Sequence, residues 1–197
     1  MDNIIITSNG IVGTNFPQDF IADNLLGKKV LVVDNGTFGA RNEQAIPENI
    51  EKFKEYGCEV VDLITLTNKN LDKIFDYDIC YLMGGNIINL VNFIHETDFK
   101  EKLEKFLEKG IYISESAAGI ILGGDVRWYL ELKRNPKLQE VKAKYLVEPV
   151  SYKGLGIVKE KIYPHINQEK SEFTVSTINK VADTLNNGEY IVKSFEI

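Results

Sequence analysis

Short runs of apolar residues alternate with longer amphipathic segments along most of the chain. Runs rich in Ile, Val and Leu predict five strands, at residues 3–7, 29–33, 59–64, 78–83 and 111–114. The segments between them predict helices, at residues 17–26, 47–56, 71–75, 87–94 and 99–108. Gly27, Gly57 and Gly110 follow three of these helices and are typical of helix C-termini.

This alternation predicts an α/β fold. Strands whose interiors are continuously apolar are typical of a parallel sheet with both faces covered. We therefore expect a doubly wound, mostly parallel sheet with helices on both faces, in a single domain over residues 1–197. The pattern weakens after residue 125: residues 127–145 are charged and irregular, 155–163 resemble a strand with a turn, 169–185 an amphipathic helix and 189–195 a closing strand.

The composition and charge are those of an acidic globular protein. Apolar residues make up 44% of the chain and charged residues 26%, which excludes disordered, collagen-like and coiled-coil chains. The formal net charge is −6, and an acidic surface repels a phosphate backbone, so no nucleic-acid partner is expected. A basic stretch at residues 133–144 is interrupted by Glu140, and we interpret it as a solvated segment.

The cysteines and the N-terminus bear on where the protein works. Cys58 and Cys80 both lie in apolar stretches, and we interpret them as buried free thiols. The N-terminal residues lack the basic segment and long apolar core of a signal peptide. No apolar run approaches the roughly 18 residues that would span a bilayer. We expect a cytoplasmic protein with no membrane partner.

Unusual polar and small residues follow three of the predicted strands, at 34–36 (Asp-Asn-Gly), 84–86 (Gly-Gly-Asn) and 114–119 (Ser-Glu-Ser-Ala-Ala-Gly). Ligands of open parallel sheets bind beyond the carboxyl ends of the strands, so these loops are the candidate site. In the third loop, Ser116 lies among small residues between a strand and a short apolar helix at 120–122. That context is typical of a nucleophile elbow, although a helix N-cap serine is the alternative.

A nucleophilic serine needs a base, and the chain has two histidines. His95 lies at the end of a predicted helix, where a histidine suits the helix dipole. His165 follows Pro164 and the end of a predicted strand, so it is the better candidate to face the crevice. An ordinary loop histidine remains the alternative there.

Three motifs in order resemble the aspartyl dipeptidase (peptidase E) family of serine peptidases, to which the cyanophycinases are related. They are Gly-Gly-Asn at 84–86, the elbow Tyr-Ile-Ser-Glu-Ser-Ala-Ala at 112–118, and Gly-Leu-Gly-Ile at 154–157 ahead of His165. The resemblance extends from the first strand to His165. It implies a class I glutamine-amidotransferase-like fold, with serine in place of the amidotransferase cysteine.

The resemblance also implies roles for individual residues. Ser116 would attack the scissile carbonyl and His165 would act as general base. Backbone N–H groups near Gly84, Gly85 and Ala117 would form the oxyanion hole. An acidic residue between the serine and the histidine would orient the imidazole, and the sequence offers two, Asp125 and Glu131, of which Asp125 is favoured because it follows two glycines at a turn.

The expected ligand is a small peptide with an N-terminal aspartate, and the expected substrate-binding residues are Asn86 and Arg127. Arginine is the usual partner of a carboxylate, and Arg127 lies near the elbow in sequence, although a surface residue is the alternative. No cofactor is expected, and no cluster with metal-ligand spacing is visible. The sequence is compatible with a homodimer and does not specify the oligomeric state.

Departures from the family pattern leave a second hypothesis open. Met83, Ile87, Ser114 and Ala118 stand where the family often has glycine or a small hydroxyl residue. The alternative is therefore a catalytically silent α/β module that binds a small ligand or a protein partner in the same crevice. A glutamine amidotransferase ranks last because no cysteine occupies the elbow. Elbow geometry separates the hypotheses: an active enzyme needs a positive φ at Ser116, His165 within hydrogen-bond distance, and an acid behind the imidazole.

Overall fold

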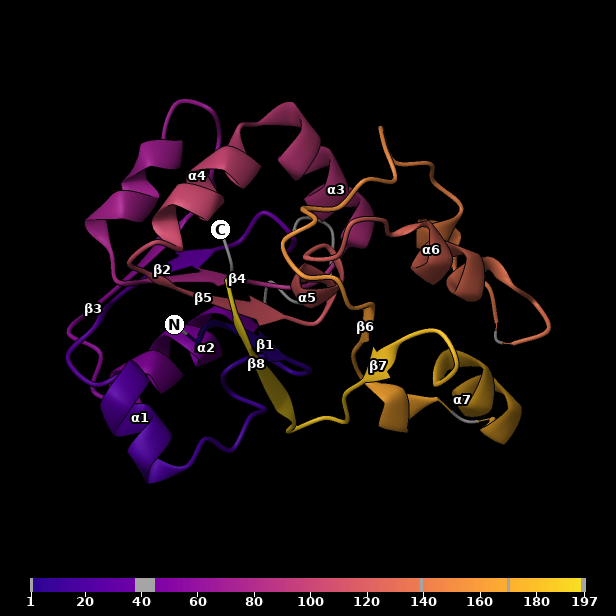
Figure 1. The fold of residues 1–197 in the computed structure, drawn as a ribbon, viewed down its shortest axis with the longest axis horizontal. Coiled ribbons are helices and arrows are strands. Elements are labelled where there is room, and N and C mark those ends of the chain that lie inside the picture. Colours follow the sequence, from indigo (N-terminus) through magenta and orange to yellow (C-terminus); the bar gives the residue numbers. More distant parts are fainter. Residues whose placement is uncertain (1, 38–44, 139, 170, 196–197) are drawn as a thin grey trace.

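A six-stranded sheet in the order β3-β2-β4-β5-β1-β8 forms the centre of the computed structural model, which describes residues 2–37, 45–138, 140–169 and 171–195 (Figure 1). The five strands β1 to β5 are parallel, and β8 pairs antiparallel with β1 at one edge. The predicted doubly wound, mostly parallel sheet is thus confirmed. The strands are β1 (Asp2–Thr7), β2 (Lys29–Val33), β3 (Val60–Ile64), β4 (Ile79–Leu82), β5 (Ile111–Glu115) and β8 (Tyr190–Ser194).

Helices cover both faces of this sheet, as the continuously apolar strands predict. Alternate residues of β1 illustrate this: Ile4 and Ile6 join one apolar cluster, and Ile5 joins the other. In Figure 1, α3 and α4 lie on one side of the sheet and α1 and α2 on the other. These elements are α1 (Gln18–Asn24), α2 (Ala45–Glu55), η2 (Leu71–Asp76), α3 (Ile87–Glu96) and α4 (Phe99–Phe106).

The C-terminal third contains a helix that the sequence does not predict. Residues 127–145 were expected to be irregular, yet α6 (Arg127–Arg134) forms there and is followed by the short η3 (Ala143–Tyr145). Tyr129 and Leu130 are buried on one face of α6, while most of its charged side chains lie on the other faces. Because charged residues surround this short apolar face, the sequence shows no clear helical periodicity there.

The predicted helix at 169–185 is too long, and residue 170 lies outside the described residues. Helix α7 (Glu172–Ile178) ends early, and β7 (Asp183–Thr184) instead pairs in parallel with β6 (Ile162–Tyr163). The strand expected at 155–163 is reduced to β6. Its first part is a connection whose N–H groups donate to the chain after the elbow, as Leu155 does to the Ile121 carbonyl at 2.7 Å.

Candidate active site

Three loops meet at the carboxyl edge of the sheet because β2, β4 and β5 are neighbours there. The loop after β2 supports the loop after β4: the N–H of Asn86 donates to the carbonyl of Gly36 at 2.8 Å. The loop after β4 in turn contacts the loop after β5. A Cβ on Gly84 would lie 2.5 Å from the Glu115 carbonyl oxygen and 2.9 Å from Ser116 Cβ, so only glycine fits this approach.

Ser116 has the backbone of a nucleophile elbow. Its φ of 49° and ψ of −113° are rare for a residue with a side chain, and the short helix α5 (Ala117–Ile120) begins at the next residue. The Ser116 N–H donates to the Thr7 carbonyl at 3.0 Å, which ties the turn to β1. Strain at a single residue that the surrounding sheet holds in place is typical of a functional position.

Ser114 and Ala118, which replace the glycines usual in an elbow, are both fully buried. The Ser114 hydroxyl donates to the Ile5 carbonyl at 3.4 Å, within the sheet. The next small residue, Gly119, packs against β1, where an added Cβ would lie 2.7 Å from Ile6 Cγ2. The added Cβ atoms at the two replaced positions are therefore compatible with the elbow conformation.

His165 lies against Ser116. The imidazole Nε2 is 2.9 Å from Ser116 Oγ. His165 itself has a left-handed backbone, with φ 59° and ψ 34°, at the start of the short η4 (Ile166–Gln168). Its N–H donates to the hydroxyl of the buried Ser8 at 2.8 Å, so the loop after β1 holds the histidine backbone in place. The sequence offered no signal for this role of Ser8.

The other ring nitrogen of His165 contacts Asn187, which is an amide and not an acid. Its Oδ1 is 2.7 Å from His165 Nδ1. The Asn187 N–H donates to Asn167 Oδ1 at 3.2 Å, and Gly188 follows with a φ of 92°. In the preceding position, both the N–H and the side-chain amide of Asn186 donate to the Glu189 carboxylate, which closes the turn. The site therefore has a Ser-His-Asn arrangement.

The structure does not bring either predicted acid to the imidazole. Asp125 is exposed, and its Oδ1 accepts the N–H of Arg127 at 2.6 Å at the start of α6. Glu131 is exposed on the same helix. Neither residue lines the pocket that contains Ser116 and His165. Both come before His165 in the chain, whereas the residue that contacts Nδ1 comes after it, in the turn ahead of β8.

The surroundings of His165 favour the neutral imidazole. Burial lowers the pKa of His165 most, and the hydrogen bond with Asn187 partly offsets this, while the nearby charge of Lys133 lowers the pKa further. If the Nδ1–H donates to Asn187 Oδ1, the Nε2 lone pair faces the Ser116 hydroxyl. This is the tautomer that a general base requires.

Two of the three expected oxyanion donors lie at the pocket. Gly85 and Ala117 both line it with Ser116, and in the described chain neither backbone N–H donates to another group. Gly85 has a φ of 126°, which requires glycine. The N–H of Gly84 instead points to the buried Glu115 carboxylate at 3.4 Å, and Gly84 is not among the lining residues.

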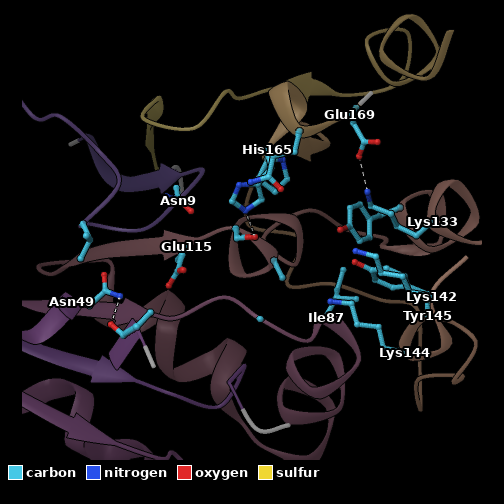
Figure 2. Close-up of a pocket in the computed structure, with 18 of the residues that line it drawn as sticks. Asn9, Asn49, Ile87, Glu115, Lys133, Lys142, Lys144, Tyr145, His165 and Glu169 are labelled. Carbon is cyan, nitrogen blue, oxygen red and sulfur yellow. Dashed lines mark hydrogen bonds and ion pairs between the residues drawn. The ribbon is translucent and has the colours of Figure 1, made fainter. Parts of the chain in front are cut away.

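The pocket around Ser116 has a volume of about 460 Å³ and two walls of opposite charge (Figure 2). Lys133, Lys142 and Lys144 lie on one side of His165, and Asn9, Asn49 and Glu115 lie on the other. Glu48 also lines the pocket, as does Glu169, whose carboxylate is paired with Lys133. Burial raises the pKa of Glu115, whose Oε2 also contacts the hydroxyl of Tyr81 at 3.0 Å.

The two residues expected to bind substrate lie outside this pocket. Asn86 caps helix α3, its side chain accepting the N–H of Ile88 at 2.9 Å. Arg127 is exposed and its guanidinium lies 4.9 Å from the Tyr152 ring centre. The positive charge at the pocket comes from the basic stretch at residues 133–144, so its interpretation as a solvated segment is wrong for these lysines. Lys133 on α6 and Lys142 and Lys144 at η3 are far apart in the sequence pattern, and they line one cavity only once that region is folded.

Cys58 and Cys80 are buried free thiols, and burial raises their pKa values to about 11 and about 12. His95 lies in the last turn of helix α3, and its Nε2 contacts the Lys153 carbonyl oxygen at 2.9 Å. Within the described ranges, no three His, Cys, Asp or Glu side chains gather as a metal site. No helix in the described part of the chain is long and apolar enough to cross a membrane.

An elbow serine hydrogen-bonded to a histidine, at the carboxyl edge of a parallel sheet, defines the serine-hydrolase class of α/β site. The sequence profile of peptidase family S51 matches residues 18–192. The chain therefore belongs to peptidase family S51.

Individual relatives agree with this assignment. Peptidase E of Nostoc sp. (strain PCC 7120 / SAG 25.82 / UTEX 2576) is 27% identical over 172 residues, which cover 82% of this chain. The match spans 64% of the length of that relative. A candidate peptidase E from Listeria monocytogenes EGD-e has the same fold over the full length of both chains, with a TM-score of 0.75 and 19% identity. A peptidase from an acI-B1 Actinobacterium has a TM-score of 0.64 at 16% identity, over 98% of this chain and 84% of its own.

Proposed function

We propose that the chain is a serine peptidase of the aspartyl dipeptidase type, with Ser116 as nucleophile and His165 as general base. The observation that carries the proposal is the 2.9 Å contact between His165 Nε2 and Ser116 Oγ, at a serine with elbow geometry. Membership of peptidase family S51 and similarity to the Nostoc peptidase E support the same activity.

The first half of the reaction is acylation. Asn187 accepts the Nδ1–H of His165, so Nε2 takes the proton of the Ser116 hydroxyl as Oγ attacks the scissile carbonyl. The carbonyl oxygen becomes an oxyanion, which the N–H groups of Gly85 and Ala117 stabilise. The C–N bond then breaks, and the protonated His165 gives its proton to the leaving amine.

The second half is deacylation. A water molecule gives a proton to the neutral His165 and attacks the acyl carbon of the ester on Ser116. The same two N–H groups stabilise the second oxyanion. The ester C–O bond breaks, His165 returns the proton to Ser116 Oγ, and the acid product leaves. The imidazole is neutral at the start of each half, which agrees with its lowered pKa.

The charges of the pocket support a short substrate that carries both carboxylate and ammonium groups. Lys142 and Lys144 offer ammonium groups to a carboxylate, such as the side chain of an N-terminal aspartate. Lys133 is already paired with Glu169 at 2.8 Å, so it contributes less to such binding. On the opposite wall, Glu48 and Glu115 suit the free α-ammonium group of a dipeptide.

The test is hydrolysis of a panel of dipeptides by the purified protein, comparing N-terminal Asp with Asn, Glu and Leu. Ser116→Ala removes the nucleophile and should abolish hydrolysis. Ser176→Ala, on the exposed side of α7, is the matched control and should leave the rate unchanged. Circular dichroism and thermal unfolding of both variants verify that folding is intact.

Each outcome has a distinct meaning. Activity on aspartyl dipeptides that Ser116→Ala abolishes supports the proposal in full. Activity on other dipeptides that the same variant abolishes supports a serine peptidase with a different specificity. If the parent and Ser116→Ala are equally inactive on the whole panel, the proposed activity is wrong, and a binding module that uses the same crevice becomes the better hypothesis.

A further inference from the structure

A largely buried ion pair joins helix α6 to the turn that carries His165. Lys133 Nζ is 2.8 Å from Glu169 Oε1, and both side chains are only 12% exposed. His165 is the N-cap of the short η4 and Glu169 is its C-cap. Tyr163, two residues before His165, has its hydroxyl 2.5 Å from Lys133 Nζ and also contacts Glu169. The three side chains therefore connect both sides of His165 to α6.

The same lysine lines the pocket. Lys133 and Glu169 both contribute to the cavity around Ser116 and His165, and Figure 2 shows their contact on the side of the pocket that carries the lysines. The Lys133 ammonium lies over the rings of Tyr163 and Tyr129, at 5.0 Å and 5.6 Å from their centres. Ring faces and a carboxylate are both favourable partners of an ammonium group in this partly dry location.

We propose that Lys133 is a positioning residue that acts through His165: its fixed positive charge keeps the imidazole neutral and ready to accept the serine proton. The inference rests on the proposed role of His165 as general base. A cation close to an imidazole disfavours the second proton on the ring. The ion pair with Glu169 holds that cation at a constant position relative to the turn.

Other charged and titratable groups line the same pocket as His165, and each of them can affect its protonation. Glu48 from α2 and Glu115 from β5 lie on the acidic wall, and Tyr129 from α6 lies beside Lys133. Lys142, Lys144 and Tyr145 come from the segment that includes η3. Lys133 differs from these groups because it combines a position in the pocket with a short ion pair to the His165 turn.

Substitutions at the two ends of the ion pair separate this role from a purely structural one. Lys133→Met and Glu169→Gln both break the same ion pair. If the ion pair had only a structural role, both substitutions would change the pKa of His165 in the same direction. The charge effect has opposite signs. Lys133→Met removes the cation and should raise the pKa of His165 by about 0.5, or about threefold in proton affinity. Glu169→Gln leaves the cation and should not raise it.

The readout is the NMR titration of the histidine ring protons, which does not depend on any substrate. The chain has two histidines, and His95→Gln assigns the remaining signal to His165. Failure of the proposed peptidase activity therefore leaves this test intact. Where the dipeptide assay works, the midpoint of the acid limb of kcat/KM in Lys133→Met should shift to higher pH, by the same amount as the pKa of His165.

Two further variants complete the design. Lys133→Arg keeps the cation and should restore the parental pKa of His165. The double variant Lys133→Met/Glu169→Gln has no unpaired buried charge, so it can replace Lys133→Met if the single variant does not fold. The pKa of His165 in the double variant should still exceed the parental value. The proposal is overturned if folded Lys133→Met, or the double variant, titrates like the parent, or if Glu169→Gln raises the pKa as Lys133→Met does.

Discussion

The Nδ1 atom of His165 lies 2.7 Å from the side-chain oxygen of Asn187, so a neutral amide orients the imidazole. An amide oxygen can fix the tautomer and the ring orientation as a carboxylate does. It supplies no negative charge to the imidazolium that forms during the reaction. Orientation and charge stabilisation, which one acidic residue usually provides together, are separated in this site.

We expect Asn187→Asp to increase activity. A carboxylate at this position stabilises the imidazolium and should raise kcat/KM by about tenfold at neutral pH. It should also raise the pKa of His165, because an adjacent anion favours the protonated ring. The measurement is kcat/KM for the best dipeptide as a function of pH.

The control for Asn187→Asp is Asn179→Asp at the exposed end of α7, which adds the same charge elsewhere. Asn187→Ala should lower kcat/KM by about tenfold, since nothing then fixes the tautomer. If Asn187→Asp has the parental rate and the parental pH profile, the argument that a negative charge beside His165 would increase activity is wrong.

The pH dependence of the parent enzyme follows from the lowered pKa of His165. Burial and the charge of Lys133 disfavour the protonated imidazole, so the neutral base persists below the ordinary value of about 6.5. Activity should therefore be full at neutral pH and fall only as the pH drops through a midpoint below 6.5. A profile of kcat/KM whose acid limb has its midpoint above 6.5 would contradict this assignment.

The sequence predicts the centre of the fold well because the buried parallel strands are continuous apolar runs. It also predicts the elbow, since a serine among small residues directly after such a strand is typical of that turn. Asn187 could not be found in this way. It precedes Gly188 in an exposed turn, where asparagine is commonplace, and its contact with His165 exists only once β8 pairs with β1.

The substrate wall could not be predicted for a related reason. Lys142 and Lys144 are exposed and belong to a stretch whose charges resemble those of any solvated segment. Their common orientation towards Ser116 depends on how α6 and η3 pack on the aromatic side chains of Tyr129 and Tyr145. Packing of this kind is a tertiary property with no periodic signal in the sequence.

The close approach of two loops predicts a large effect of Gly84→Ala. The new Cβ would lie 2.5 Å from the Glu115 carbonyl oxygen. Both atoms are fixed to the backbone, so neither can rotate away. We expect activity to fall by about a hundredfold because the elbow shifts, and stability to fall by about 1–3 kcal/mol. The control is Gly124→Ala, whose Cβ would meet nothing within 4 Å. Equal effects of the two substitutions in activity and denaturation assays would rule out the steric explanation.

The charged pocket wall predicts a split between KM and kcat. Lys142→Gln and Lys144→Gln should each raise KM for an aspartyl dipeptide by about three- to tenfold, since each removes one exposed partner of the substrate carboxylate. The value of kcat should change little, because neither side chain contacts Ser116 or His165. KM for a dipeptide with N-terminal Asn provides an internal reference.

Arg127→Gln is the matched control for the two lysine variants. Its guanidinium lies over Tyr152, outside the pocket, so KM should stay at the parental value. If Arg127→Gln raises KM and the lysine variants do not, the substrate carboxylate binds elsewhere and the assignment of this wall is wrong.

Two buried strand tyrosines give a prediction about stability alone. Tyr112 and Tyr81 are both 0% exposed. The Tyr112 hydroxyl has no hydrogen-bond partner in the described chain, whereas the Tyr81 hydroxyl contacts Asn49 at 2.8 Å and Glu115 at 3.0 Å. An unpaired buried hydroxyl is costly, so Tyr112→Phe should raise the free energy of unfolding by about 1 kcal/mol.

Tyr81→Phe removes the same atom from a satisfied network. It takes away the hydroxyl that lies between the buried Asn49 and Glu115 oxygens, and it leaves the Ile11 N–H without its acceptor. The free energy of unfolding should therefore fall, by about 1–3 kcal/mol. Urea denaturation of both variants at the same pH measures the difference, with equal m values as the sign that the unfolded states match. Opposite signs support the argument that hydrogen-bond satisfaction decides the outcome, because the two substitutions delete one oxygen each from equally buried rings. Destabilisation of similar size in both would mean that ring packing dominates instead.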